Sequence, residues 1–390
     1  MFISVDLRRE YNRKLWLVDA QVGQTSIWCD TIIRINRNMK KTKVMLHYSQ
    51  YGVQRSPNDQ QDLLRASLLL QEKYEFITLD QPDLPGKDGH IKSIKELYKQ
   101  IKETKPDIVH IIGVKEGFHC MIATFLARCP KRIVITRGFA GLTPKLSPIR
   151  RFVFRWFIEP LILVLSTYVH CNSYFSYNQQ MVRLFAKQKR MVVYNFLNFR
   201  PFCHEHIWRN SVGLGDDCFI VATVGNMHAG KGYDLLQKVI NHFHDNNDIK
   251  FVTMGSGVLK ETFEKENADN NNVFVLGAVP HEQVIQIMSE SNVFYLPTRF
   301  ESLGMVYAEA GACGIPAIGT DVGAVNEIIE DGKTGYLLKI EDYKTAILKI
   351  EELYNNREKC MMMGKTAQKK IFSMFSSDNV AKDIMDLYSK

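Results

Sequence analysis

Short runs of β-branched and aromatic residues alternate with helical patterns along nearly the whole chain. Each run is short enough for a buried strand, and strands that alternate with helices build parallel sheets with helices on both faces. The alternation occurs in two series, separated by a polar, irregular stretch at residues 199–215. Because 390 residues exceed what one hydrophobic core usually supports, the pattern predicts an α/β protein with two doubly wound, Rossmann-like domains.

The strands expected in the first series are residues 14–20, 43–48, 74–79, 108–113, 132–137, 167–172 and 191–195. Those expected in the second are residues 218–224, 250–254, 273–277, 293–297 and 316–319. The irregular stretch between the series is the natural position for an interdomain linker. We therefore expect domains at residues 1–200 and 201–374 and a terminal helical segment at residues 375–390.

Composition argues against several classes of protein. The eight cysteines are scattered without a C-x-x-C pair, which disfavours a zinc site and a disulfide framework and favours a reducing cytoplasm. No stretch has the apolar length of a transmembrane helix, and the charged N-terminus lacks the apolar core of a signal peptide. The net charge of +8 favours an acidic partner, but the sequence contains no nucleic-acid-binding motif.

Two carboxylates flank an expected loop-to-helix junction in the second half of the chain. Residues 293–297 form an apolar run, and Gly304 then opens a helical stretch at residues 305–313, so Glu301 precedes the helix and Glu309 lies within it. The free N–H groups of a helix N-terminus suit a phosphate, and carboxylates beside it can accept hydrogen bonds from sugar hydroxyls. The pattern predicts a ligand with both phosphate and hydroxyl groups.

The residues around this pair extend the pattern over residues 297–335. They include Pro297, residues 310–316, Gly323, Glu327 and the run Asp331-Gly-Lys-Thr-Gly335. This string resembles the retaining glycosyltransferases of the GT-B fold, family 4 (glycosyl transferases group 1), whose signature is two glutamates separated by seven residues.

The resemblance assigns a role to each part of the segment. It implies that Glu309 binds the ribose of a nucleotide-sugar donor and that Glu301 faces the donor sugar. It also implies that the backbone contributes to diphosphate binding at Leu303, Gly304, Met305 and Val306. No metal or other cofactor is expected, because helix N–H groups and a lysine can stabilise the leaving diphosphate.

That lysine is expected in the loop after the strand at residues 218–224. Gly225 permits close backbone approach, and Lys231 can pair with phosphate. The resemblance implies that Lys231 binds the donor diphosphate, whereas Asn226 occupies a position where the family usually has arginine; His228 is a further candidate in the same loop. Gly255 and Gly277 end the next two expected strands. They are candidates for walls of the nucleobase and diphosphate site, but ordinary turns would require glycine there as well.

The resemblance implies that the first half is the acceptor-binding domain, where fewer of the family's motifs are present. Gly23, after the first expected strand, is the candidate for a loop near the donor phosphate. Arg137 stands where relatives often have histidine; an arginine cannot act as a base but can stabilise a phosphate, and we assign it an electrostatic catalytic role. His110 and His119 are the alternatives, although the sequence favours a buried structural histidine on a strand or helix for each.

Residues 144–165 combine arginines with several aromatic residues. This pattern suits a surface helix among anionic headgroups, and it also suits a half-buried helix with a solvated basic rim. The terminal segment resembles the family's helices that cross back to the first domain, which would make the interdomain cleft a hinge that closes over the substrates.

The resemblance implies a cytoplasmic, retaining glycosyltransferase of the hexosyltransferase class, with residues 144–165 as the candidate for peripheral contact with the inner face of the plasma membrane. It would move a sugar from a UDP- or GDP-sugar to a glycan or lipid-linked acceptor in bacterial surface polysaccharide synthesis. Two alternatives stay open: a GT-B nucleotide-sugar epimerase, which needs no acceptor, and a non-catalytic nucleotide-sugar-binding scaffold subunit.

Overall fold

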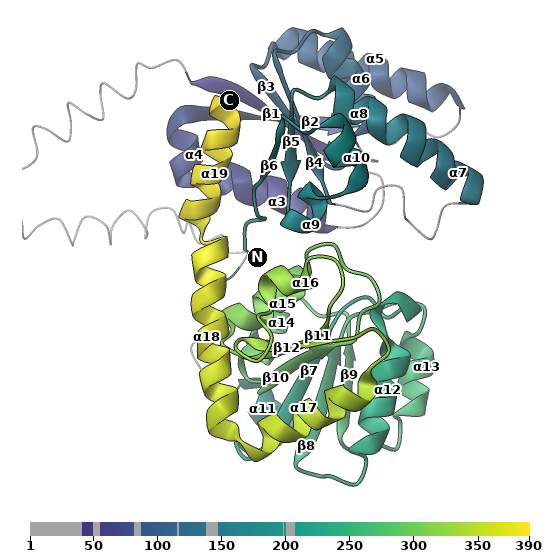
Figure 1. The fold of residues 1–390 in the computed structure, drawn as a ribbon, viewed down its shortest axis with the longest axis vertical. Coiled ribbons are helices and arrows are strands. Elements are labelled where there is room, and N and C mark those ends of the chain that lie inside the picture. The colour runs from purple at the N-terminus through teal and green to yellow at the C-terminus, as the bar shows by residue number, and fades with distance from the viewer. Residues whose placement is uncertain are drawn as a thin grey trace, which may run out of the picture.

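The computed structural model describes residues 41–49, 55–81, 87–114, 117–137, 147–197, 199 and 207–390. Two six-stranded parallel sheets lie in separate halves of the molecule, each flanked by helices (Figure 1). The expected strand at residues 14–20 and the candidate Gly23 lie outside the described residues.

The first sheet has the order β2-β1-β3-β4-β5-β6. Its strands are β1 (Thr42–Ser49), β2 (Tyr74–Gln81), β3 (Ile108–Ile111), β4 (Lys131–Thr136), β5 (Tyr168–Cys171) and β6 (Arg190–Val192). Its helices are α3 (Arg55–Ala66), α4 (Leu68–Lys73), α5 (Lys87–Thr104), α6 (Phe118–Leu126), α7 (Pro148–Val153), α8 (Glu159–Leu165), α9 (Tyr174–Tyr177) and α10 (Gln180–Phe185), with a π-helical turn, Phe154–Ile158, between α7 and α8.

The second sheet has the order β12-β11-β10-β7-β8-β9. Its strands are β7 (Phe219–Val224), β8 (Ile249–Met254), β9 (Val273–Gly277), β10 (Val293–Leu296), β11 (Ala317–Thr320) and β12 (Gly335–Leu338). The helices of the second half are α11 (Ile207–Ser211), α12 (Tyr233–His242), α13 (Lys260–Glu266), α14 (His281–Ser289), α15 (Met305–Ala312), α16 (Val325–Ile328), α17 (Tyr343–Asn355), α18 (Arg357–Phe375) and α19 (Ser377–Ser389), and a 3₁₀ turn, Ala229–Lys231, precedes α12. Helix α11 lies within the stretch at residues 199–215 that was expected to be irregular.

Both strand orders reverse direction once, between β1 and β3 and between β7 and β10. In a doubly wound sheet the helices leave opposite faces at such a point, so the carboxyl ends of the two strands border a crevice. Side chains of β7 alternate between two cores, with Ile220 in one and Phe219 and Val221 in the other. The α/β class and the doubly wound architecture expected from the sequence are therefore present, whereas β12 was not predicted.

The last two helices connect the halves. Helix α18 runs along the second half and α19 lies beside α4 of the first (Figure 1). Val380, Ile384 and Leu387 of α19 share a buried core with Val44 and Leu46 of β1. The C-terminal helix is thus part of the first hydrophobic core, although it follows the second sheet in sequence.

Buried histidines join α19 to the sheet. The Val193 carbonyl can only accept, so Nε2 of His170 carries a proton and donates to it at 2.7 Å. His170 Nδ1 then accepts from His110 Nε2 at 3.1 Å, and His110 Nδ1 accepts from the Tyr388 hydroxyl at 2.8 Å. Both histidines must be neutral for this chain of hydrogen bonds to form.

Acidification should therefore lower the free energy of unfolding. Burial lowers the pKa of His47 and of His170 to about 4 and holds the pKa of His110 well below its usual value. Unfolded histidine titrates near 6.5, so between about pH 6.5 and 4 the unfolded chain binds more protons and stability falls with falling pH. Glu159 offsets part of this loss of stability. Burial raises its pKa to about 7, so the folded chain binds this proton more tightly than the unfolded chain does.

With three histidines against one glutamate, urea titrations should show a net loss on the order of 3 kcal/mol between pH 7 and 5. The variant His170→Gln, which cannot titrate, should show a smaller dependence on pH. Equal stability at both pH values would contradict the assignment of neutral buried histidines.

Candidate functional site

A cavity of about 310 Å³ opens at the carboxyl ends of β7 and β10, at the reversal point of the second sheet. Both halves of the chain line it. The lining residues are Arg137, Asn172 and Asn195 from the first half and Val224, Gly225, Asn226, Lys231, Glu301, Ser302, Leu303, Gly304, Met305, Val306 and Glu309 from the second. The structure thus brings together ten of the candidate residues that the sequence singled out.

The N-terminus of α15 forms one wall of this cavity. Gly304 precedes the helix with φ of 82°, a left-handed conformation that glycine adopts without strain, and a Cβ there would lie 2.7 Å from the Tyr307 ring. The first N–H groups of a helix have no intrahelical acceptor, and the positive end of its dipole favours an anion. Leu303 anchors this turn in the core with 2% of its surface exposed.

Lys231 and Glu301 meet across the cavity. The Lys231 ammonium lies 2.5 Å from Glu301 Oε2, and both side chains are more than four-fifths buried. The second carboxylate oxygen of Glu301 accepts from the Ser302 N–H at 3.1 Å. A cation and an acid are therefore held beside the helix N-terminus, where an anionic ligand could draw Lys231 away from its carboxylate.

Glu309 lies one turn into α15 and has its own partner. Its Oε1 is 3.1 Å from Nε2 of His281, at the start of α14. The Glu309 side chain lines the cavity and is 17% exposed, whereas the His281 side chain is 43% exposed. Glu309 can accept further hydrogen bonds from hydroxyl groups in the cavity, since a carboxylate has several acceptor positions.

The other two predicted glycines lie behind the cavity wall. Neither lines the cavity. A Cβ on Gly255 would lie 2.0 Å from the carbonyl oxygen of Gly225, and the Gly255 N–H donates to the Gly277 carbonyl at 2.6 Å. Gly255 therefore lets the ends of β7 and β8 approach closely, whereas a Cβ on Gly277 would meet only the Lys260 side chain.

The loop after β7 places its polar residues in different ways. Asn226 lines the cavity as expected, with an amide where an arginine would add charge. His228 does not line it, because its Nδ1 accepts the Gly230 N–H at 3.0 Å and caps the turn that carries Lys231. The candidate His228 therefore shapes this turn from outside the cavity.

The first half contributes Arg137 and two asparagines, which follow β4, β5 and β6. The alternatives to Arg137 lie elsewhere: His110 is buried in the histidine chain, and His119 is bonded to His90 at 2.8 Å. Sequence reasoning missed Asn172 and Asn195, because they belong to separate segments and form no local pattern. Only their position at strand ends could have indicated them.

Arg299, which the sequence did not indicate, ties three segments around the site. Its guanidinium makes two bonds of 2.7 Å to Asp234 at the start of α12 and reaches Glu341 at 2.5 Å. The same side chain donates to the Ala229 carbonyl at 2.6 Å, and the Arg299 N–H donates to Gly230. Arg299 thus fixes the Lys231 turn against the loop that carries Glu301.

Arg299, Asp234 and Glu341 form a clamp, and its members are favoured in their charged forms. The guanidinium holds the pKa of Asp234 and of Glu341 below their usual values, and the two carboxylates raise the pKa of Arg299. Glu341 adopts φ of 69°, an uncommon conformation for a residue with a side chain. Its carboxylate makes a bidentate contact with the Arg299 guanidinium, at 2.5 Å and 2.9 Å.

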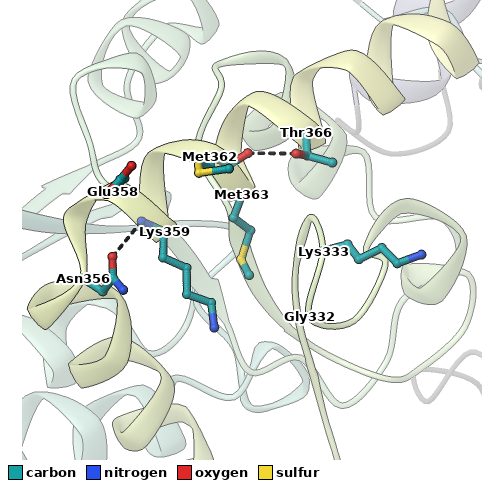
Figure 2. A pocket seen from close by; sticks show the side chains of 8 residues that line it. All are labelled: Gly332, Lys333, Asn356, Glu358, Lys359, Met362, Met363 and Thr366. Carbon is teal, nitrogen blue, oxygen red and sulfur yellow. Dashed lines mark hydrogen bonds between the residues drawn. The ribbon is translucent and has the colours of Figure 1, made fainter.

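A larger hollow of about 480 Å³ lies between the turn before β12 and α18. Figure 2 shows its two lysines, Lys333 and Lys359, pointing in different directions, and each is paired with a glutamate. These cations do not converge on a common anion. Among the described residues, no group of three or more His, Cys, Asp or Glu side chains is arranged to hold a metal ion.

The chain was compared with known proteins. Residues 205–370 match the family model of glycosyl transferases group 1. CapM of Staphylococcus aureus, a capsular polysaccharide biosynthesis glycosyltransferase, is 25% identical over 77% of this chain and 80% of its own. An Escherichia coli UDP-Gal:alpha-D-GlcNAc-diphosphoundecaprenol alpha-1,3-galactosyltransferase is 24% identical over 76% of this chain and 79% of its own.

Solved structures show the same architecture. HepE of Anabaena, in complex with UDP and glucose, has a TM-score of 0.72 at 16% identity, covering 89% of this chain and 99% of its own. Sucrose-phosphate synthase of Thermosynechococcus elongatus has the same TM-score at 17% identity, covering 90% and 98%. The fold is therefore GT-B. The match to glycosyl transferases group 1 thus covers the second half of the chain, and the chain is a glycosyltransferase.

The Arg299 clamp leads to a test of site positioning. Arg299→Ala should lower kcat/KM for the sugar donor by roughly ten- to a hundredfold, because it frees the Lys231 turn and leaves two carboxylates unpaired. The kcat/KM of Arg299→Lys should lie between those of the parent and of Arg299→Ala, because lysine keeps the charge but cannot make the bidentate contacts.

Steady-state kinetics with varied donor would measure both variants, with Lys333→Ala as an exposed ion-pair control. Parent-like donor kinetics in Arg299→Ala would show that the clamp does not position the site.

Proposed function

We propose that this glycosyltransferase transfers a sugar from a nucleotide-sugar donor, with retention of the anomeric configuration, to a saccharide or lipid-linked acceptor in surface polysaccharide synthesis. The observation that carries the proposal is the cavity in which Lys231, Glu301 and Glu309 surround the N-terminus of α15. This arrangement offers a cation and free N–H groups for a diphosphate and carboxylates for hydroxyl groups.

The donor binds mainly to the second half. Glu309 accepts from the ribose hydroxyls, and the diphosphate lies against the N–H groups at Met305 and Val306. Lys231 leaves Glu301 for the diphosphate, and Glu301 then orients the donor sugar. UDP is the first candidate for the nucleotide, since HepE was solved with UDP and the name of the Escherichia coli relative specifies UDP-Gal; GDP is the second.

The reaction breaks the bond between the anomeric carbon and the diphosphate and forms a bond from that carbon to an acceptor oxygen on the same face. Negative charge grows on the leaving diphosphate, where Lys231 and the helix N-terminus stabilise it. Arg137 adds positive charge from the first half. The acceptor hydroxyl gives its proton to a departing phosphate oxygen. In this scheme the protein's own cations and N–H groups supply the stabilisation, with no metal or other cofactor.

Nucleotide binding tests the donor site. UDP-glucose should raise the melting temperature of the parent, with GDP- and ADP-glucose as the alternative bases. Lys231→Ala should weaken binding by about ten- to a hundredfold, the usual effect of losing a charge-assisted hydrogen bond, and Glu309→Ala should also weaken it. Thermal shift at several ligand concentrations would measure this.

The matched controls are Lys333→Ala and Glu330→Ala, an exposed ion pair away from the cavity. If none of the three sugar nucleotides shifts the parent, the donor-site assignment fails. Binding of a sugar nucleotide without any turnover would favour the non-catalytic scaffold alternative. Sugar turnover without any acceptor, with no transfer product, would instead favour the epimerase alternative.

We also propose that the enzyme works at the cytoplasmic face of the plasma membrane, with α7, α8 and the π-helical turn against the lipid. Phe154, Ile162 and Leu163 pack into the first core. The opposite side exposes apolar side chains beside Arg150 and Arg151: Ile149, Phe152, Trp156, Phe157, Leu161 and Val164. Exposed apolar groups beside arginines suit an anionic membrane surface. No helix in the described part of the chain has the length and apolarity to cross a bilayer.

Vesicle binding tests this surface. The double variant Arg150→Gln/Arg151→Gln should bind phosphatidylglycerol vesicles at least tenfold more weakly than the parent, at about 1 kcal/mol for each charge. Co-sedimentation at low salt would measure it, with Lys365→Gln/Lys369→Gln on the exposed side of α18 as the charge-matched control. Equal weakening in both double variants would indicate general attraction without a specific membrane face.

A further inference from the structure

One carboxylate of the second half is bound entirely by donors from the first. Glu327 lies on α16, and its Oε1 accepts the Phe175 N–H at 2.7 Å. Its Oε2 accepts the Tyr174 N–H and the Tyr194 hydroxyl, both at 2.9 Å. A charged acceptor with three donors forms a stronger contact than neutral groups would make.

Apolar packing surrounds this contact. Phe175 and Tyr194 pack against the core of the second half, and the Tyr194 ring lies 5.2 Å from the Phe375 ring at the end of α18. Figure 1 shows α9 and α16 facing each other where the two halves meet. The carboxylate is therefore the polar centre of a packed contact between the domains.

On its own side, Glu327 is tied to the donor loop. Gly323 precedes α16 with φ of 61°, and a Cβ there would lie 1.7 Å from the Glu301 carbonyl oxygen. The Ala324 N–H donates to the Ser302 carbonyl at 3.1 Å, and Val325 and Ile328 are buried. Helix α16 thus has little freedom to move relative to Glu301 and Ser302.

On the other side, the partners of Glu327 adjoin the first-half wall of the cavity. Asn172 lies two residues before Tyr174, and Asn195 directly follows Tyr194. The helix α9 that presents Tyr174 and Phe175 is itself fixed by a capping box from Ser173. A shift of these donors would therefore move Asn172 and Asn195 relative to Glu301.

We infer that Glu327 is a positioning residue that assembles the active site from its two halves, holding the wall with Asn172 and Asn195 at a fixed distance from the donor loop. The inference rests on the proposed function. Donor binding involves mainly the second half, so Glu327 is not needed for it. Sugar transfer needs both walls and depends on Glu327.

The test compares Glu327→Gln with Tyr194→Phe, which removes one of the three bonds, and with Glu330→Gln, the same chemical change on a neighbouring exposed residue. Glu327→Gln should leave the Kd for UDP within twofold of the parent by calorimetry. Its kcat for transfer should fall at least tenfold and its KM for the acceptor should rise. Tyr194→Phe should show a smaller loss, and Glu330→Gln should match the parent.

Small-angle X-ray scattering adds a readout of domain arrangement, and the scattering of Glu327→Gln should indicate a more open particle than the parent. Loss of UDP binding in Glu327→Gln, or transfer kinetics equal to those of Glu330→Gln, would overturn the inference. A parent that neither binds a nucleoside diphosphate nor transfers sugar would overturn the proposed function, and this inference with it. An active parent matched by Glu327→Gln would overturn the inference alone.

Discussion

The site depends on backbone segments that touch each other directly at the carboxyl ends of the second sheet. A Cβ on Gly232 would lie 2.0 Å from the Pro297 carbonyl oxygen, and one on Gly323 would lie 1.7 Å from that of Glu301. Both glycines also have positive φ, which other residues adopt only with strain. Because these glycines lack side chains, the Lys231 turn, the Glu301 loop and the turn before α16 can form one continuous wall.

Ion pairs then hold these closely packed segments in place. Arg299 holds the outside of the wall through two carboxylates, and Lys231 and Glu301 form the pair on its inside. Isolated surface ion pairs contribute little, but bidentate arginine contacts in a network are the recognised exception. The inner pair is exchangeable in the proposed reaction, because a diphosphate competes with Glu301 for the same ammonium. The outer clamp keeps that ammonium in place as its partner changes.

The fold followed closely from sequence, because apolar strand runs and helical periods are local signals. Every expected strand among the described residues is present near its predicted bounds. β12 escaped prediction, since Gly335–Leu338 is a short strand that directly follows a glycine-rich turn. Of the site, Glu301, Glu309 and Lys231 were found because each belongs to a contiguous motif at a strand end.

Contacts between distant segments could not be predicted in the same way. Arg299 meets Asp234 and Glu341 only after three loops have folded together. Glu327 was visible as part of a motif, but its partners lie about 150 residues away, so the sequence gives no sign of the contact. The position of His228 depended on a hydrogen bond within its own turn, which a residue type alone does not specify.

Hydrogen–deuterium exchange with a bound nucleoside diphosphate, UDP first, would test the central claim most directly. The claim is that the diphosphate lies between the Lys231 turn and the N-terminus of α15. The account predicts slower exchange in residues 225–231 and 301–309, with little change around the hollow beside α18. Slower exchange confined to that hollow or to the first half, with residues 301–309 unaffected, would contradict it.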